Sequence, residues 1–139
     1  MISGGAAVGM SWALPVWLLA GLVFAWTPVH FWALALAYRE DYVNADYPML
    51  PAKVSSQTAA WWTGLHTVFT AGFALSIGLV PQVDWLFLLI VSIGTVPLVK
   101  KTIALLYVQD RPTAFGLFGY SNLYLALVLA VSMLAMIWR

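Results

Sequence analysis

The chain is 139 residues long, 63% hydrophobic and 8% charged, and its mean hydropathy is +0.92. A soluble domain carries about 25% charged residues, so this composition excludes a water-soluble globular domain and indicates a membrane protein. A net charge of +1 gives no electrostatic basis for nucleic-acid binding. The absence of cysteine excludes a disulfide framework, a thiolate metal site and a cysteine nucleophile.

Residues 1–10 are small and carry no signal for the start of a helix. They also lack the basic residues of a cleavable signal peptide. Spanning a bilayer takes about 20 apolar residues, and runs of this kind predict four transmembrane helices, at 12–37, 59–80, 85–108 and 114–138. Pro28 and Pro97 fall inside two of these helices, where they predict kinks. We therefore expect an all-α, polytopic membrane helix bundle that forms a single domain over 1–139.

The loop over 38–58 is the strongest polar feature, and Pro48 and Pro51 argue against a continuous helix there. It holds three of the five acidic residues of the chain: Glu40, Asp41 and Asp46. Magnesium usually takes one or two carboxylates and shares its other coordination positions with phosphate and water. Arg39 and Lys53 stand beside these carboxylates and suit phosphate oxygens. The loop therefore fits a diphosphate bridged by Mg²⁺, and the alternative is a solvated loop whose charges only fix topology.

Basic residues predict the orientation in the membrane. Five of the six fall on one side if the spans alternate in direction: Arg39, Lys53, Lys100, Lys101 and Arg111. The positive-inside rule then places both polar loops, 38–58 and 109–113, in the cytoplasm of a multi-pass protein of the cell (plasma) membrane. The two adjacent lysines most simply extend to the lipid headgroups, or one of them faces the bundle and neutralises a diphosphate. Asp110 and Arg111 are expected to cap or pair locally at the start of the last helix.

One face of the first predicted helix combines aromatic, ionisable and small residues. At about 100° per residue, Trp26, His30, Ala33 and Ala37 share a stripe that leads towards Asp41. The two alanines either leave a groove for an apolar ligand or allow a neighbouring helix to pack closely. An ionisable residue inside the membrane is costly and favours a functional role for His30. The alternative is a neutral histidine that is hydrogen-bonded to a neighbouring helix.

Four segments, in order along the chain, resemble one enzyme family. The segment Trp26–Ala35, WTPVHFWALA, resembles the W-x-P-x-H-F-W-A-L segment of protoheme IX farnesyltransferases (haem O synthases), which are UbiA-type intramembrane prenyltransferases. The segment Tyr38–Pro51, with Asp41-Tyr42 and a final Pro-Met-Leu-Pro, is similar to the loop that follows in that family. Gly4–Ala7 and Leu117–Ser121 resemble two further family segments.

The resemblance implies a fold and a reaction. The family is similar to a nine-helix bundle, and this chain resembles its C-terminal half. Such enzymes use Mg²⁺ to bind farnesyl diphosphate between two acidic motifs and transfer the farnesyl group to a vinyl group of haem b, giving haem O. Asp41 then matches a metal-binding catalytic carboxylate, with Glu40 and Asp46 as further magnesium ligands. The side chains expected to contact diphosphate, isoprenoid or haem are His30, as a second catalytic candidate, and Trp26, Phe31, Trp32, Tyr38, Arg39 and Lys53.

The chain departs from the family pattern in its acidic motifs. The first motif, of the form N-D-x-x-D-x-x-x-D, does not occur. The second is not a regular D-x-x-x-D, because Asp41 and Asp46 are five residues apart, and Asp46 stands where the family often has Gly or Asn. We therefore expect no catalysis by this chain alone and a separate N-terminal half or other membrane subunit as partner.

Three other functions remain open from the sequence. One is a UbiA-type prenyltransferase that acts on a quinone precursor or a chlorophyllide, against which the His-Phe-Trp segment argues. Another is a non-catalytic, haem-binding membrane subunit that keeps the packing without the chemistry. The last is a proton or solute carrier that uses His30 and His66, although paired intramembrane charges and inverted repeats are absent.

Overall fold

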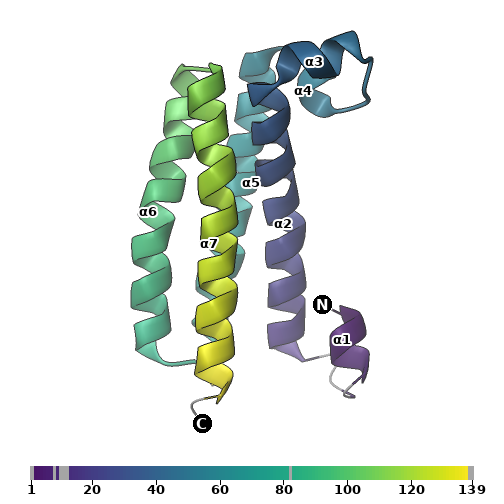
Figure 1. Cartoon of the computed structure of the whole chain (residues 1–139). Helices are drawn as coiled ribbons and strands as arrows, with labels where there is room; N and C mark the ends of the chain where they lie inside the picture. Colours follow the sequence, from purple (N-terminus) through teal and green to yellow (C-terminus); the bar gives the residue numbers. More distant parts are fainter. Residues whose placement is uncertain (1, 8, 10–12, 82, 138–139) are drawn as a thin grey trace.

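The computed structural model describes residues 2–7, 9, 13–81 and 83–137. Within these residues the chain is all-helical, as the composition predicts, and no strand occurs. Four long helices stand side by side (Figure 1): α2 (Leu14–Ala37), α5 (Ser56–Ile77), α6 (Trp85–Tyr107) and α7 (Arg111–Ile137). Trp12, Trp138 and Arg139, which belong to the expected outer ends of the first and last spans, lie outside the described residues.

The long helices pack in a ring, because α2 and α6 each contact both α5 and α7. Two short helices, α3 (Arg39–Asn44) and α4 (Leu50–Lys53), interrupt the expected polar loop at the end of α2 (Figure 1). A further short helix, α1 (Ile2–Ala7), packs against α2 at the other end. Our expectation that residues 1–10 hold no helix is therefore wrong for this segment, whose two alanines are good helix formers.

Side-chain caps place the starts of two long helices three residues before the expected positions. Ser55 Oγ accepts a hydrogen bond from the Thr58 N–H at 3.1 Å, so α5 begins in the polar loop. The Asp110 carboxylate accepts one from the Thr113 N–H at 2.9 Å, which is the capping role expected for Asp110. Hydrogen bonding from Thr113 also holds the pKa of the Asp110 carboxyl below its ordinary value.

In the described part of the chain, three helices are long and apolar enough to cross a membrane: α2, α6 and the Arg111–Ala135 part of α7. The prediction of about four spans is thus supported for three by length and composition. The fourth helix, α5, is 22 residues long but more polar, with Thr63, Thr67 and Thr70 buried in it. Each of these hydroxyls donates to the carbonyl four residues earlier, which satisfies it without water. The protein is a membrane helix bundle.

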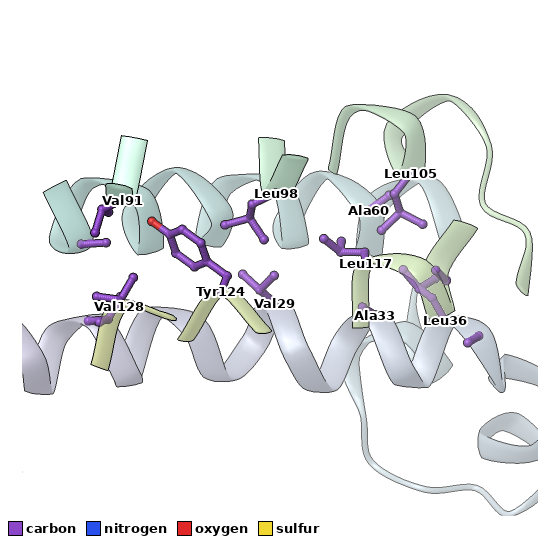
Figure 2. Packing of buried hydrophobic residues seen from close by; sticks show 14 of the residues in the cluster. Val29, Ala33, Leu36, Ala60, Val91, Leu98, Leu105, Leu117, Tyr124 and Val128 are labelled. Atoms are coloured by element: carbon purple, nitrogen blue, oxygen red, sulfur yellow. The ribbon is translucent and has the colours of Figure 1, made fainter. Parts of the chain in front are cut away.

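The interior of the bundle is mainly apolar. Val29, Leu98 and Tyr124 belong to one buried cluster that runs along the bundle (Figure 2). Ala33 is completely buried and Ala37 is 7% exposed, so this part of the α2 stripe lets neighbouring elements approach closely. Of the two interpretations of the small residues, close packing holds at Ala33, whereas Ala37 borders a cavity at the end of α2.

Candidate functional site

A cavity of about 470 Å³ opens at the end of the bundle where α2 ends and α7 begins. Its lining comes from both polar loops and from the last turn of α2: Leu36, Ala37, Tyr38, Arg39, Glu40, Asp41, Ser56, Gln109 and Arg111. Tyr38 and Gln109 are 71 residues apart in sequence, and the contact between α2 and α7 brings the two loops together. The wall of the cavity is therefore mainly polar, and Leu36 and Ala37 of α2 supply its apolar part.

Tyr38 creates the bend that turns the acidic residues towards this cavity. Its dihedral angles, φ −118° and ψ 33°, are not helical and separate α2 from α3. Glu40 and Asp41 therefore occupy the first turn of a new helix and line the cavity instead of continuing the α2 stripe. Both carboxylates are exposed, and hard oxygen donors of this kind suit Mg²⁺.

Arg39 has a structural role beside its place in the cavity wall. Its Nε donates to the Pro51 carbonyl and its Nη2 to the Val54 carbonyl, both at 3.0 Å. These bonds tie the segment that returns to α5 against the end of α2. No hydrogen bond from Nη1 to the described residues is found, and Arg39 is one of the residues that line the cavity.

Asp46 and Lys53 lie apart from the cavity and bind each other. The Lys53 ammonium donates to the Asp46 carboxylate, and this bond lowers the pKa of Asp46 from its ordinary value. Asp46 has φ +48°, a left-handed conformation that Gly and Asn adopt readily, which explains why such residues suit this position. The structure thus separates Asp46 and Lys53 from the other predicted site residues.

Arg111 joins the site from the second loop, which the sequence analysis did not foresee. Its guanidinium carbon lies 4.5 Å from the centroid of the Tyr38 ring, a cation–π contact between α7 and the end of α2. We expected Arg111 to pair locally, yet it faces the same cavity as Glu40 and Asp41. The sequence feature that could have indicated this role of Arg111 is that both polar loops are predicted on the same side of the membrane.

His30 lies deeper in the bundle and is 9% exposed. Its ring is stacked between Trp26 and Phe118, with centroids 4.6 Å and 4.4 Å away. Its Nδ1 lies 3.0 Å from Ser121 Oγ, and that hydroxyl donates to the Phe118 carbonyl. The single hydroxyl hydrogen is therefore used, so Nδ1–H is assigned as the donor and Nε2 as the acceptor. This geometry matches a neutral histidine that is hydrogen-bonded to a neighbouring helix.

The two aromatic neighbours of His30 in sequence point to different sides. Phe31 is 47% exposed and meets the His30 ring edge-on at 5.4 Å. Trp32 instead packs edge-on against His66 of α5 at 5.2 Å. Nδ1 of His66 is buried and makes no hydrogen bond to the described residues. The expected His-Phe-Trp group is therefore divided between two helix interfaces.

Residues 1–118 match the sequence profile of the UbiA prenyltransferase family. The chain belongs to the UbiA prenyltransferase family. It is 37% identical over 135 residues to the protoheme IX farnesyltransferase of Sulfolobus acidocaldarius. The aligned region covers 97% of this chain and 47% of that relative. The protoheme IX farnesyltransferase of Thermus thermophilus is 39% identical over 91% of the chain and 21% of the relative. That of Saccharolobus islandicus is 36% identical over 94% of the chain and 49% of the relative.

The chain thus spans about half the length of the archaeal relatives and about a fifth of the Thermus relative. No solved structure gives a significant match. Family membership agrees with the resemblance found in the sequence. Within the described residues, no group of three or more His, Cys, Asp or Glu side chains is placed to hold a metal ion. Two carboxylates at the cavity still fit Mg²⁺, because this ion commonly takes its remaining ligands from phosphate and water.

Proposed function

We propose that the cavity binds the diphosphate of farnesyl diphosphate and that the chain takes part in farnesyl transfer to haem b, as the names of its relatives suggest. The observation that carries the proposal is the convergence of Arg39, Glu40 and Asp41 from one loop with Arg111 from the other. Cationic and acidic groups around one polar opening suit an anion shared with a divalent cation. The apolar bundle begins directly beneath them.

Each side chain has a role in this proposal. Arg111 and Nη1 of Arg39 bind phosphate oxygens, because guanidinium groups form charge-assisted hydrogen bonds with them. Glu40 and Asp41 hold Mg²⁺, which when bound neutralises the charge that develops on the departing diphosphate. The C1–O bond of the farnesyl group breaks with its electron pair on the diphosphate. The apolar helices keep water away from the allylic cation until a haem vinyl carbon bonds to its C1. Water then adds to the positive charge left on the other vinyl carbon and releases one proton to solvent, which leaves a hydroxyl group.

The acceptor site and the complete reaction involve more than the cavity. His30 and Phe31 at the interface of α2 and α7 line the acceptor or isoprenoid site in this proposal, and Trp32 lines the opposite interface. The chain spans about half of the Sulfolobus and Saccharolobus relatives and about a fifth of the Thermus relative, and of the described carboxylates Glu40 and Asp41 line the cavity. We therefore expect farnesylation of haem b to need further helices. Purified chain that converts haem b to haem O without a partner would contradict that requirement. An assay that offers quinone precursors, chlorophyllide and haem b in parallel and measures which of them is prenylated distinguishes haem b from the other acceptors of UbiA-type enzymes.

Binding of farnesyl diphosphate to the purified chain in lipid nanodiscs tests the diphosphate site directly. We expect calorimetric titration to show Mg²⁺-dependent binding, which Asp41→Asn weakens about tenfold, the value of one charge-assisted interaction. Asp46→Asn is the matched control, because it removes an equal charge from the same loop but away from the cavity. Equal affinities for Asp41→Asn and the unaltered chain would refute the proposal, as would an equal loss in both variants.

We propose that both polar loops lie on the cytoplasmic side of the plasma membrane, because Arg39, Lys53 and Arg111 cluster at the end of the bundle that carries these loops. The absence of native cysteine makes this simple to test. A single cysteine at Asn44, in α3, should resist a membrane-impermeant maleimide added to intact cells and should react after lysis. Reaction in intact cells would place this loop outside.

A further inference from the structure

The end of helix α6 leaves two carbonyls that the backbone does not satisfy. The helix ends at Tyr107, and Val108 is extended, with φ −133° and ψ 104°. The Val108 N–H closes the last helical bond, to the Ala104 carbonyl at 2.8 Å. No backbone N–H of the described residues bonds to the carbonyls of Leu105 and Leu106. Such carbonyls at a helix end need donors from side chains or water.

Gln109 supplies these donors with its amide nitrogen. Its Nε2 donates to the Leu105 carbonyl and to the Leu106 carbonyl, both at 2.9 Å. Because carbonyls only accept hydrogen bonds, the –NH₂ group must face the helix end, and this settles which way round the amide lies. The two hydrogens of the amide are thereby used. No hydrogen bond to the amide oxygen is found among the described residues.

Gln109 also lines the cavity that Glu40 and Asp41 line. It is half-buried and follows α6 after a single residue, so a long helix fixes its position. The polar atom that it can offer to a ligand is the amide oxygen, which only accepts hydrogen bonds. Phosphate oxygens are acceptors too, so this atom does not suit a diphosphate. It suits a hard cation, because carbonyl oxygens are ligands of the same class as carboxylates and water.

We propose that the Gln109 amide oxygen is a neutral ligand of the Mg²⁺ ion held by Glu40 and Asp41. This inference rests on the proposed diphosphate site, because the ion is the one that accompanies the diphosphate there. The second polar loop then serves both charges of the bound pair, with Arg111 on the anion and Gln109 on the cation. Three protein oxygens leave coordination positions for phosphate and water, as Mg²⁺ prefers.

Gln57 provides a comparison within the same chain. Its Nε2 donates to the Leu106 carbonyl at 3.1 Å, so it caps the same helix end as Gln109. Unlike Gln109, Gln57 is exposed and does not line the cavity. If capping α6 were the whole role of Gln109, removal of either glutamine would act on the cavity in the same indirect way.

The test measures how much free Mg²⁺ the full chain in nanodiscs needs to bind labelled inorganic diphosphate. We expect Gln109→Leu to raise the half-saturating Mg²⁺ concentration about fivefold, the value of one neutral polar contact. Excess Mg²⁺ should restore the diphosphate affinity of the unaltered chain, because the contacts to the anion are intact. Gln57→Leu, the matched control, should change the Mg²⁺ requirement less than about twofold.

Gln109→Glu separates the oxygen from the cap. This variant loses the same donors to α6 as Gln109→Leu, but it keeps an oxygen, now charged, at the same position. We expect its Mg²⁺ requirement to be no higher than that of the unaltered chain. Gln109→Asn withdraws the amide by one carbon and replaces Gln109→Leu if that variant does not fold. It should also need more Mg²⁺ than the unaltered chain.

The results that would overturn the inference differ from those that would overturn the diphosphate site. A loss of diphosphate affinity in Gln109→Leu that excess Mg²⁺ does not restore means that the glutamine only holds the loop, and the diphosphate site stands. An unchanged Mg²⁺ requirement in Gln109→Leu, or an equal rise in Gln109→Glu or in Gln57→Leu, has the same meaning. If the unaltered chain binds no diphosphate at any Mg²⁺ concentration, the proposed function fails as well.

Discussion

Replacing Arg111 by glutamine removes the one cationic side chain that α7 contributes to the cavity wall. A charge-assisted hydrogen bond is worth about 1.5–3 kcal/mol, and Arg111 is exposed, so screening places its contribution near the lower figure. Since about 1.4 kcal/mol corresponds to a factor of ten, we expect Arg111→Gln to weaken Mg²⁺-dependent binding of diphosphate about tenfold. The stability of the bundle should fall by less than about 1 kcal/mol, the value of an exposed cation–π contact with Tyr38.

The assay is calorimetric titration at two ionic strengths, with three variants. Arg111→Lys keeps the charge but loses the planar fork and the stacking on Tyr38, so its affinity should fall between those of the unaltered chain and Arg111→Gln. Lys100→Gln removes an equal charge from α6 outside the cavity lining and should change affinity less than about twofold. If Arg111→Gln binds diphosphate with the affinity of the unaltered chain, or with the same affinity as Lys100→Gln, the second loop is not part of the site.

Three further changes test the packing and the loop. Ser121→Ala leaves the buried imidazole nitrogen of His30 without its acceptor, so we expect a loss of about 1 kcal/mol in reversible SDS unfolding; unchanged stability would contradict the hydrogen bond. Gly21→Ala puts a methyl group 2.5 Å from a phenylalanine ring of α5 and should lower stability by about 1–3 kcal/mol, whereas Gly72→Ala meets nothing within 4 Å and should not. The lysine ammonium beside Asp46 depresses the pKa of this carboxyl, so the ion pair contributes above the ordinary value of 3.8 and is lost as pH falls through the lower, folded-state pKa. The protection of loop amides, measured relative to the intrinsic exchange rate at each pH, should therefore fall on acidification in the unaltered chain and not in Asp46→Asn, and equal pH dependence of protection in both would be evidence against the pair.

The helices could be predicted from sequence because a bilayer imposes a simple rule on composition. Long apolar runs predicted the positions of α2, α6 and α7, and two prolines marked the break that follows α2. Helix starts were less predictable, because they depend on single capping side chains such as Ser55. The polarity of α5 also went unremarked, since its threonine hydroxyls bond within their own helix and leave the pattern of apolar residues intact.

The composition of the candidate site was predictable only within one loop. Glu40 and Asp41 are adjacent in sequence, so their common place in the cavity follows from local structure. Arg111 enters the site because α7 returns beside α2, a tertiary contact that no local pattern encodes. The pairing of Asp46 with Lys53 is likewise a matter of three-dimensional reach, and charge counting in the loop could not distinguish it from a shared metal site.

The two bonds from Arg39 to the carbonyls of Pro51 and Val54 have a consequence for how the loop tolerates change. They fasten the base of the loop, so its tip around Asp46 can lengthen or carry an inserted peptide while the cavity wall keeps its shape. A guanidinium stays protonated at any pH a cell encounters, which makes this fastening permanent. An epitope tag or fluorescent reporter placed at the tip would therefore follow the molecule in living membranes without disturbing the opening beneath it.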